Sequence, residues 1–201
     1  MRKKYTRIKI CGLTNLNDTL VAVHSGADAV GFIFAPSRRR IDPENAQYII
    51  QKLPPFVSVV GVFMNQSLDE VKEIMDLTGV EVVQLHGGES PEFCEKIPKR
   101  IIKRIPIHQG DAQENLIERM KPYTVSAFIL DPGAGDGQTF DWEIAKSIEQ
   151  PIILAGGLTT ENVKQAVHIV QPDGVDVSSG VEIRPGDKDP RKIKQFIQEV
   201  R

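Results

Sequence analysis

Two residues in this sequence have side chains that could act as a base and an acid. Cys11 ends a β-branched run that starts at Ile8, and Asp131 ends a later run of the same kind. A thiolate can remove a proton and a carboxylic acid can supply one, so the two could deprotonate one atom of a ligand and protonate another. Either residue could instead be structural, because most free cysteines are buried as small apolar groups and Asp-Pro-Gly is a turn sequence.

The thiol of Cys11 would need help to act as a base. The reference pKa of a thiol is about 8.5, and a nearby cation or helix N-terminus lowers it. Lys9 precedes Cys11 by two residues. Side chains two apart in a strand point to the same face, so both could point inward.

Two glycine-containing loops predict a phosphate site. Gly156-Gly157 ends one run, and Ser178-Ser179-Gly180 ends the next. Glycine allows backbone N–H groups to approach an anion closely. We therefore expect Gly156, Gly157, Ser179 and Gly180 to bind phosphate, with ordinary tight turns as the alternative.

Other polar residues at the run ends could bind a ligand. Arg38-Arg39-Arg40 could hold a carboxylate or phosphate, although such clusters are usually solvated. His86 could be a hydrogen-bonding group or merely structural. Asp176 could contact ligand hydroxyls or orient the phosphate loop. The four histidines show no metal-ligand spacing, so we expect no metal.

Eight short β-branched runs would position these residues. They start about 24 residues apart on average, near Ile8, Ala29, Val57, Val80, Ile101, Val125, Pro151 and Asp173. That spacing fits a strand, a helix and two short loops. Helix-start signals lie between the runs, including Asn15, Pro43, Ser67 and Ser90. The helix predicted from Ser90 contains Cys94, which we interpret as a core residue.

The eight units predict a single-domain α/β protein over residues 1–201, folded as a (β/α)₈ TIM barrel. The runs are continuously apolar, which is typical of parallel strands covered on both faces. No linker interrupts the series, and no G-x-G-x-x-G follows the first run, which disfavours the alternative of an open doubly wound sheet. In such barrels the active site lies at the C-terminal ends of the strands, where the residues above would meet.

The composition excludes several classes of protein. Apolar residues make up 40% and charged residues 26%, which is typical of neither a membrane span nor a disordered chain. The net charge of −2 argues against a nucleic-acid partner. With two cysteines and no signal-peptide pattern, the sequence predicts a soluble cytoplasmic protein. We expect a monomer, with a homodimer as the alternative.

Several motifs lie along nearly the whole chain. They are Ile8-Lys-Ile-Cys-Gly-Leu-Thr, Ala27-Asp-Ala-Val-Gly-Phe-Ile-Phe, Val62-Phe-Met-Asn, Val83-Gln-Leu-His-Gly, Thr139-Phe-Asp-Trp, Ala155-Gly-Gly-Leu-Thr-Thr-Glu-Asn-Val and Gly174-Val-Asp-Val-Ser-Ser-Gly-Val-Glu. Together they resemble the phosphoribosylanthranilate isomerases. The resemblance implies a cofactor-independent Amadori rearrangement in tryptophan biosynthesis. N-(5-phosphoribosyl)anthranilate would become 1-(2-carboxyphenylamino)-1-deoxyribulose 5-phosphate.

The resemblance also assigns roles. It implies that Asp131 is the general acid, Cys11 the general base, and Arg39 the group that holds the anthranilate carboxylate. The chain departs from the family pattern at Ala134 and Asp136, and at Arg40, which leaves the choice between Arg39 and Arg40 open. The alternatives are an isomerase of the histidine-pathway aminoaldose and a non-catalytic phosphosugar-binding barrel.

Overall fold

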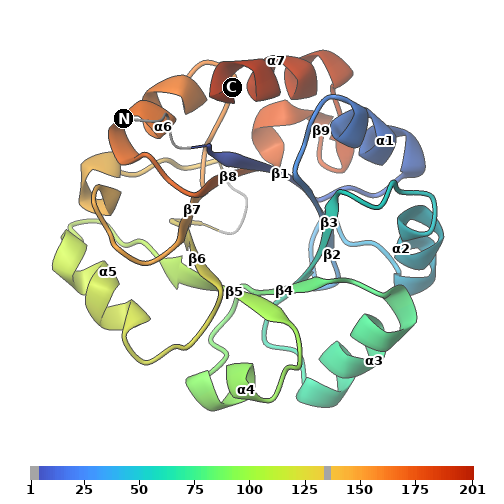
Figure 1. Ribbon diagram of the computed structural model, residues 1–201, viewed down its shortest axis with the longest axis horizontal. Helices are drawn as coiled ribbons and strands as arrows, with labels where there is room; N and C mark the ends of the chain where they lie inside the picture. The colour runs from blue at the N-terminus through green and yellow to red at the C-terminus, as the bar shows by residue number, and fades with distance from the viewer. Residues whose placement is uncertain (1–4, 134–136) are drawn as a thin grey trace.

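A closed barrel of eight parallel strands forms the centre of the molecule, and helices surround it (Figure 1). The computed structural model describes residues 5–133 and 137–201. Each strand pairs with the next in chain order, and β8 pairs with β1 to close the ring. The strands are β1 (Arg7–Cys11), β2 (Ala29–Ile33), β3 (Ser58–Phe63), β4 (Val82–Leu85), β5 (Arg100–Pro106), β6 (Ala127–Asp131), β7 (Ile152–Leu154) and β8 (Gly174–Val177). The predicted TIM barrel is confirmed, and each strand starts within two residues of its expected position.

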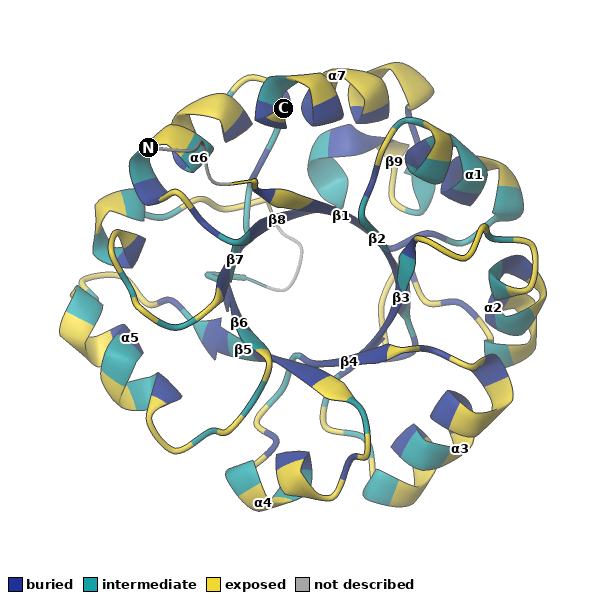
Figure 2. Cartoon of the chain, in the orientation of Figure 1, coloured by how far each residue is buried: buried dark blue, intermediate teal, exposed yellow. Residues whose placement is uncertain are grey.

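The core has two layers because each strand is covered on both faces. The larger layer fills the space between the strands and the helices. The helix faces toward the strands are buried, and the opposite faces are exposed (Figure 2). A smaller cluster of Val60, Val82, Ile102, Ile129 and Ala155 lies inside the barrel. Burial on two faces explains why the strands read as unbroken apolar runs.

Local sequence signals set the ends of the helices. Asn15, Ser67 and Ser90 each accept a backbone N–H bond at a helix start, as expected of N-cap residues. Pro43 is the first residue of its helix. The α-helices are α1 (Leu16–His24), α2 (Pro43–Ile50), α3 (Leu68–Thr78), α4 (Pro91–Glu95), α5 (Gln113–Met120), α6 (Val163–Val170) and α7 (Pro190–Val200).

None of the described helices combines the length and apolar character needed to cross a membrane.

Two parts of the chain differ from a regular βα series. Between β6 and β7 the described residues contain only the 3₁₀ helix η1 (Trp142–Ala145), where we expected an α-helix. After β8, the 3₁₀ helix η2 (Ser179–Val181) leads into an antiparallel hairpin of β9 (Glu182–Arg184) and β10 (Asp187–Lys188). This hairpin was not predicted, and it returns Lys188 to the loop that follows β8, since its ammonium bonds to the carbonyl oxygen of Ser178 at 3.1 Å.

Candidate active site

Two adjoining cavities open where the strands end. The larger, about 120 Å³, is lined by Cys11, Arg39, Gln84, His86 and Asp131 among others. The smaller, about 50 Å³, is lined by the glycine loops that follow β7 and β8. Asp131, Asp176 and Ser178 line both cavities. The expected acid and base therefore face one space that continues toward the expected phosphate loops.

Cys11 is buried at the end of β1, with charged groups of both signs around it. Burial raises the pKa of its thiol, and Asp176 raises it further, whereas Lys9 and Lys188 lower it. Lys9 is itself buried and donates to Asp176 at 2.9 Å. Asp176 was expected to contact ligand hydroxyls or to orient the phosphate loop. It is bound to a lysine and lines both cavities.

Asp131 ends β6 and faces His86 across the cavity. The carboxylate Oδ2 lies 3.5 Å from His86 Nε2, and the Gln84 amide nitrogen lies 3.2 Å from the other ring nitrogen. Burial, with Arg104, Lys9 and Lys103 nearby, lowers the pKa of His86 to about 3. The imidazole is therefore neutral at pH 7. With Gln84 donating to Nδ1, Nε2 carries the proton and can donate it toward Asp131.

Arg39 is held in place by a buried acid. Its Nε and one terminal nitrogen donate to the two carboxylate oxygens of Glu182 at 2.8 Å each. Lys188 donates to the same carboxylate at 2.8 Å. Of the three consecutive arginines only Arg39 is buried and lines the cavity, whereas Arg40 is exposed. A bidentate pair of this kind fixes the plane of the guanidinium.

The loops after β7 and β8 are packed closely around the smaller cavity. Gly156 and Gly157 have φ of 82° and 59°, a left-handed conformation that glycine adopts without strain. A Cβ on Gly180 would lie 1.9 Å from the carbonyl oxygen of Leu158, so only glycine allows the two loops to meet. Ser179 lines the same cavity. Glycine loops of this kind can bring backbone N–H groups close to an anion.

Comparison with known proteins identifies the family. Residues 8–199 match the family described as "PRAI: N-(5'phosphoribosyl)anthranilate (PRA) isomerase". The chain is also 47% identical over 200 residues to the N-(5'-phosphoribosyl)anthranilate isomerase of Pelobacter propionicus, covering 96% of this chain and 94% of that one. The chain belongs to the N-(5'-phosphoribosyl)anthranilate isomerase family.

Solved structures of phosphoribosylanthranilate isomerases share the fold. One, in complex with reduced 1-(o-carboxyphenylamino)-1-deoxyribulose 5-phosphate, has a TM-score of 0.86 and 42% identity, covering 97% of this chain and 98% of that one. Another is described as monomers generated from the dimeric enzyme of Thermotoga maritima, with a TM-score of 0.87, 41% identity and the same coverage. Both forms of assembly therefore occur among these relatives.

The isomerase site contains residues that reasoning from the sequence missed. Glu182 binds Arg39, and Lys188 binds Glu182 and acts on the thiol of Cys11, but neither was given a role. Gln84 was also missed: its Oε1 is buried and has no hydrogen-bond partner among the described residues. Glu182 ends a quoted family motif, and the need of a buried arginine for an acid could have pointed to it. Ala134 and Asp136, where the chain departs from the family pattern, lie outside the described residues. Within them, no group of three or more His, Cys, Asp and Glu residues could hold a metal ion.

Proposed function

We propose that Cys11 and Asp131 are the general base and general acid of the isomerase reaction. The chain converts N-(5-phosphoribosyl)anthranilate to 1-(2-carboxyphenylamino)-1-deoxyribulose 5-phosphate, the Amadori rearrangement of its family in tryptophan biosynthesis. The observation that carries the assignment of roles is that both side chains line one cavity at the C-terminal end of the barrel. The family also decides against an aminoaldose isomerase and a non-catalytic binding barrel.

The reaction needs one proton delivered and one removed. Protonated Asp131 donates to the furanose ring oxygen while the C1–O bond breaks, and the nitrogen lone pair forms the protonated Schiff base. The Cys11 thiolate then removes the C2 proton, and the electron pair left on C2 moves toward nitrogen to give a neutral enolamine. The enolamine tautomerises to the ketone. An acid and a base on facing walls can act at the two positions without releasing the intermediate.

Other residues would orient the substrate by its two charged ends. The guanidinium nitrogen of Arg39 that Glu182 does not bind is proposed to meet the anthranilate carboxylate. Gly156, Gly157, Ser179 and Gly180 would bind the phosphate through backbone N–H groups and the serine hydroxyl. His86 and Asp176 are proposed to contact the opened sugar, and Gln84 Oε1 to accept from a substrate O–H or N–H group.

The roles are tested by single substitutions assayed on phosphoribosylanthranilate. Cys11→Ala and Asp131→Asn should each lower kcat by at least about 10², the usual scale of acid–base catalysis. Cys94→Ala is the matched control, because Cys94 is also buried but lies in α4 away from the cavity. Near-normal turnover in both site variants would show that the roles are wrongly assigned.

Three further properties are part of the proposal. Residues 1–201 act as a single barrel domain, the reaction requires no cofactor, and the protein works in the cytoplasm. The proposed role of Cys11 supports the last, because a reactive thiol is preserved in a reducing compartment. Cell fractionation with immunodetection tests the location, and full turnover by protein treated with a metal chelator tests the absence of a metal.

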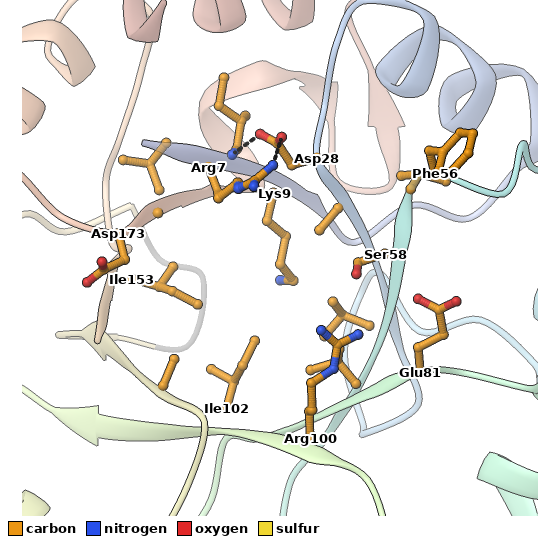
Figure 3. A pocket seen from close by; sticks show the side chains of 18 of the residues that line it. Arg7, Lys9, Asp28, Phe56, Ser58, Glu81, Arg100, Ile102, Ile153 and Asp173 are labelled. Atoms are coloured by element: carbon orange, nitrogen blue, oxygen red, sulfur yellow. Dashed lines mark hydrogen bonds and ion pairs between the residues drawn. The ribbon is translucent and has the colours of Figure 1, made fainter. Parts of the chain in front are cut away.

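We further propose a homodimer, the alternative that the sequence left open. A cavity of about 550 Å³ lies at the N-terminal end of the barrel (Figure 3). The active site lies at the other end of the strands. The walls of the 550 Å³ cavity include Val60, Val82 and Ile102, and charged side chains of both signs surround it. Phe56 lines this cavity and is 98% exposed. A two-fold axis would insert the Phe56 ring of each copy into the apolar cavity of the other and pair opposite charges around it.

Sedimentation velocity at micromolar concentration tests the dimer. The wild-type protein should sediment as a dimer and Phe56→Asp as a monomer. Tyr48→Asp is the control, since Tyr48 is also a mostly exposed aromatic residue but does not line the cavity. A monomeric wild-type protein would contradict this part of the proposal.

A further inference from the structure

A buried ion pair lies next to Cys11, and its lysine has no part in the reaction described above. Lys9 and Asp176 are 4% and 9% exposed, and their charged atoms lie 2.9 Å apart. Lys9 comes from β1 and Asp176 from β8, the two strands that close the barrel. The Lys9 side chain points into the barrel interior (Figure 3). Burial of two charges costs several kcal/mol per ion before pairing, so this arrangement needs an explanation beyond stability.

Gly31 provides the space in which the Lys9 ammonium and the Cys11 thiol converge. Gly31 is the residue of β2 that pairs with Cys11. A Cβ added to Gly31 would lie 2.9 Å from Cys11 Sγ and 3.0 Å from Lys9 Nζ. The glycine therefore opens room beside the sulfur, and the lysine nitrogen uses it.

The charges around Cys11 have opposing effects on its thiol. Burial raises the pKa of the thiol, and Asp176 raises it further. Four charged groups face Cys11: Lys9 from β1, Arg39 from the loop after β2, Asp176 from β8 and Lys188 from β10. His86 and Asp131 line the same cavity. Lys9 exerts the largest of the effects that lower the pKa of the thiol.

Lys9 stays charged throughout the neutral pH range. Burial acts to lower its pKa, but the interactions with Asp176 and Cys11 outweigh burial, and the pKa of Lys9 is raised. The thiolate is the form of Cys11 that can act as a base. A buried cation at a fixed position stabilises a thiolate more than a solvent-exposed cation does, because water screens the exposed charge. Asp176 holds the ammonium in position through a hydrogen bond of 2.9 Å.

We propose that Lys9 is a positioning residue that stabilises the thiolate of Cys11, with Asp176 anchoring the Lys9 ammonium beside the sulfur. This inference rests on the proposed role of Cys11 as the base. When the thiolate takes the C2 proton, an S–H bond forms, the C2–H bond breaks, and the electron pair neutralises the Schiff base. Lys9 keeps its proton throughout and remains paired with Asp176.

The test is a pH titration of the Cys11 thiolate, followed by its absorbance near 240 nm. Each variant is made in a Cys94→Ser background, and the spectrum of the same protein carrying Cys11→Ser is subtracted to remove tyrosine ionisation. Lys9→Met should raise the thiol pKa by at least one unit, which is at least tenfold less thiolate at pH 7. Lys9→Arg should restore most of the shift. The low-pH limb of kcat/KM should move with the thiol pKa.

Asp176→Asn should shift the thiol pKa in the direction opposite to Lys9→Met. It keeps a side-chain oxygen that can accept from the Lys9 ammonium and removes the negative charge that raises the thiol pKa, so the thiol pKa should fall. If Lys9 and Asp176 were needed only for folding, their substitutions would not shift the pKa of the Cys11 thiol in opposite directions. An unchanged thiol pKa in Lys9→Met would overturn the inference; if that variant does not fold, an unchanged or raised pKa in Asp176→Asn would do so. Failure of the proposed base is distinguishable, because Cys11→Ala would then keep its turnover whatever the titration shows.

Discussion

Replacing Glu182 by Gln should destabilise the protein and weaken substrate binding together. Glu182 is 7% exposed and accepts two bonds from Arg39 and one from Lys188, all at 2.8 Å. The substitution keeps the shape of the side chain and removes its charge, which leaves two buried cations without this counter-charge. Burial already lowers the pKa of Lys188, so Lys188 can lose its proton, whereas a guanidinium cannot.

Breaking a buried ion pair costs about 3–5 kcal/mol. With a urea m-value of about 2 kcal/mol/M, a loss of about 3 kcal/mol lowers the unfolding midpoint by about 1.5 M. Urea unfolding followed by circular dichroism measures this shift. Because Arg39 would no longer be held in place, we also expect KM to rise about tenfold or more, with a smaller change in kcat.

Asp187→Asn is the matched control. It removes the Arg184–Asp187 pair of the same hairpin, whose side chains are 79% and 40% exposed. Such exposed pairs contribute less than about 1 kcal/mol. If Glu182→Gln shifted the midpoint no more than this control and left KM unchanged, Glu182 would not be what holds Arg39, and the reasoning would be refuted.

Three further outcomes are expected. The His86 imidazole should stay neutral between pH 8 and 4, because burial lowers its pKa to about 3; its NMR signals should not titrate over that range, and a midpoint near 6.5 would contradict its burial. The pKa of Glu182 is lowered below its usual 4.5 because Arg39 and Lys188 outweigh its burial. Its contribution to stability is therefore complete above pH 4.5 and lost as the pH falls through the lowered value, so the stability advantage of the wild-type protein over Glu182→Gln should shrink there in urea titrations. Gly180→Ala should cost about 1–3 kcal/mol and raise KM, since its Cβ would strike the Leu158 carbonyl; a variant with wild-type stability and KM would show that the two loops separate freely.

The elements could be predicted because local sequence dictates them. Residues buried on both faces of parallel strands must be apolar, so β1 to β8 appear as runs, and Asn15, Pro43, Ser67 and Ser90 mark helix starts through bonds or geometry within a few residues. The sequence pattern did not predict the elements in two segments where such local signals are weak. The segment before β7 forms only η1 among its described residues, and the hairpin of β9 and β10 is too short for a periodic signal.

The sequence by itself determined the barrel, the family and the candidate residues at the strand ends. It also placed Lys9 on the face of Cys11, through the two-residue repeat of a strand. Only the tertiary structure decided the partners: Asp176 binds Lys9 across 167 residues, and Glu182 binds Arg39 across 143. The physical reason is that charge pairing inside a barrel depends on which strands become neighbours when the ring closes. Residue spacing along the chain does not show which strands are neighbours. The charged groups that shift the pKa of Cys11 and bind Arg39 could therefore be identified only from the fold.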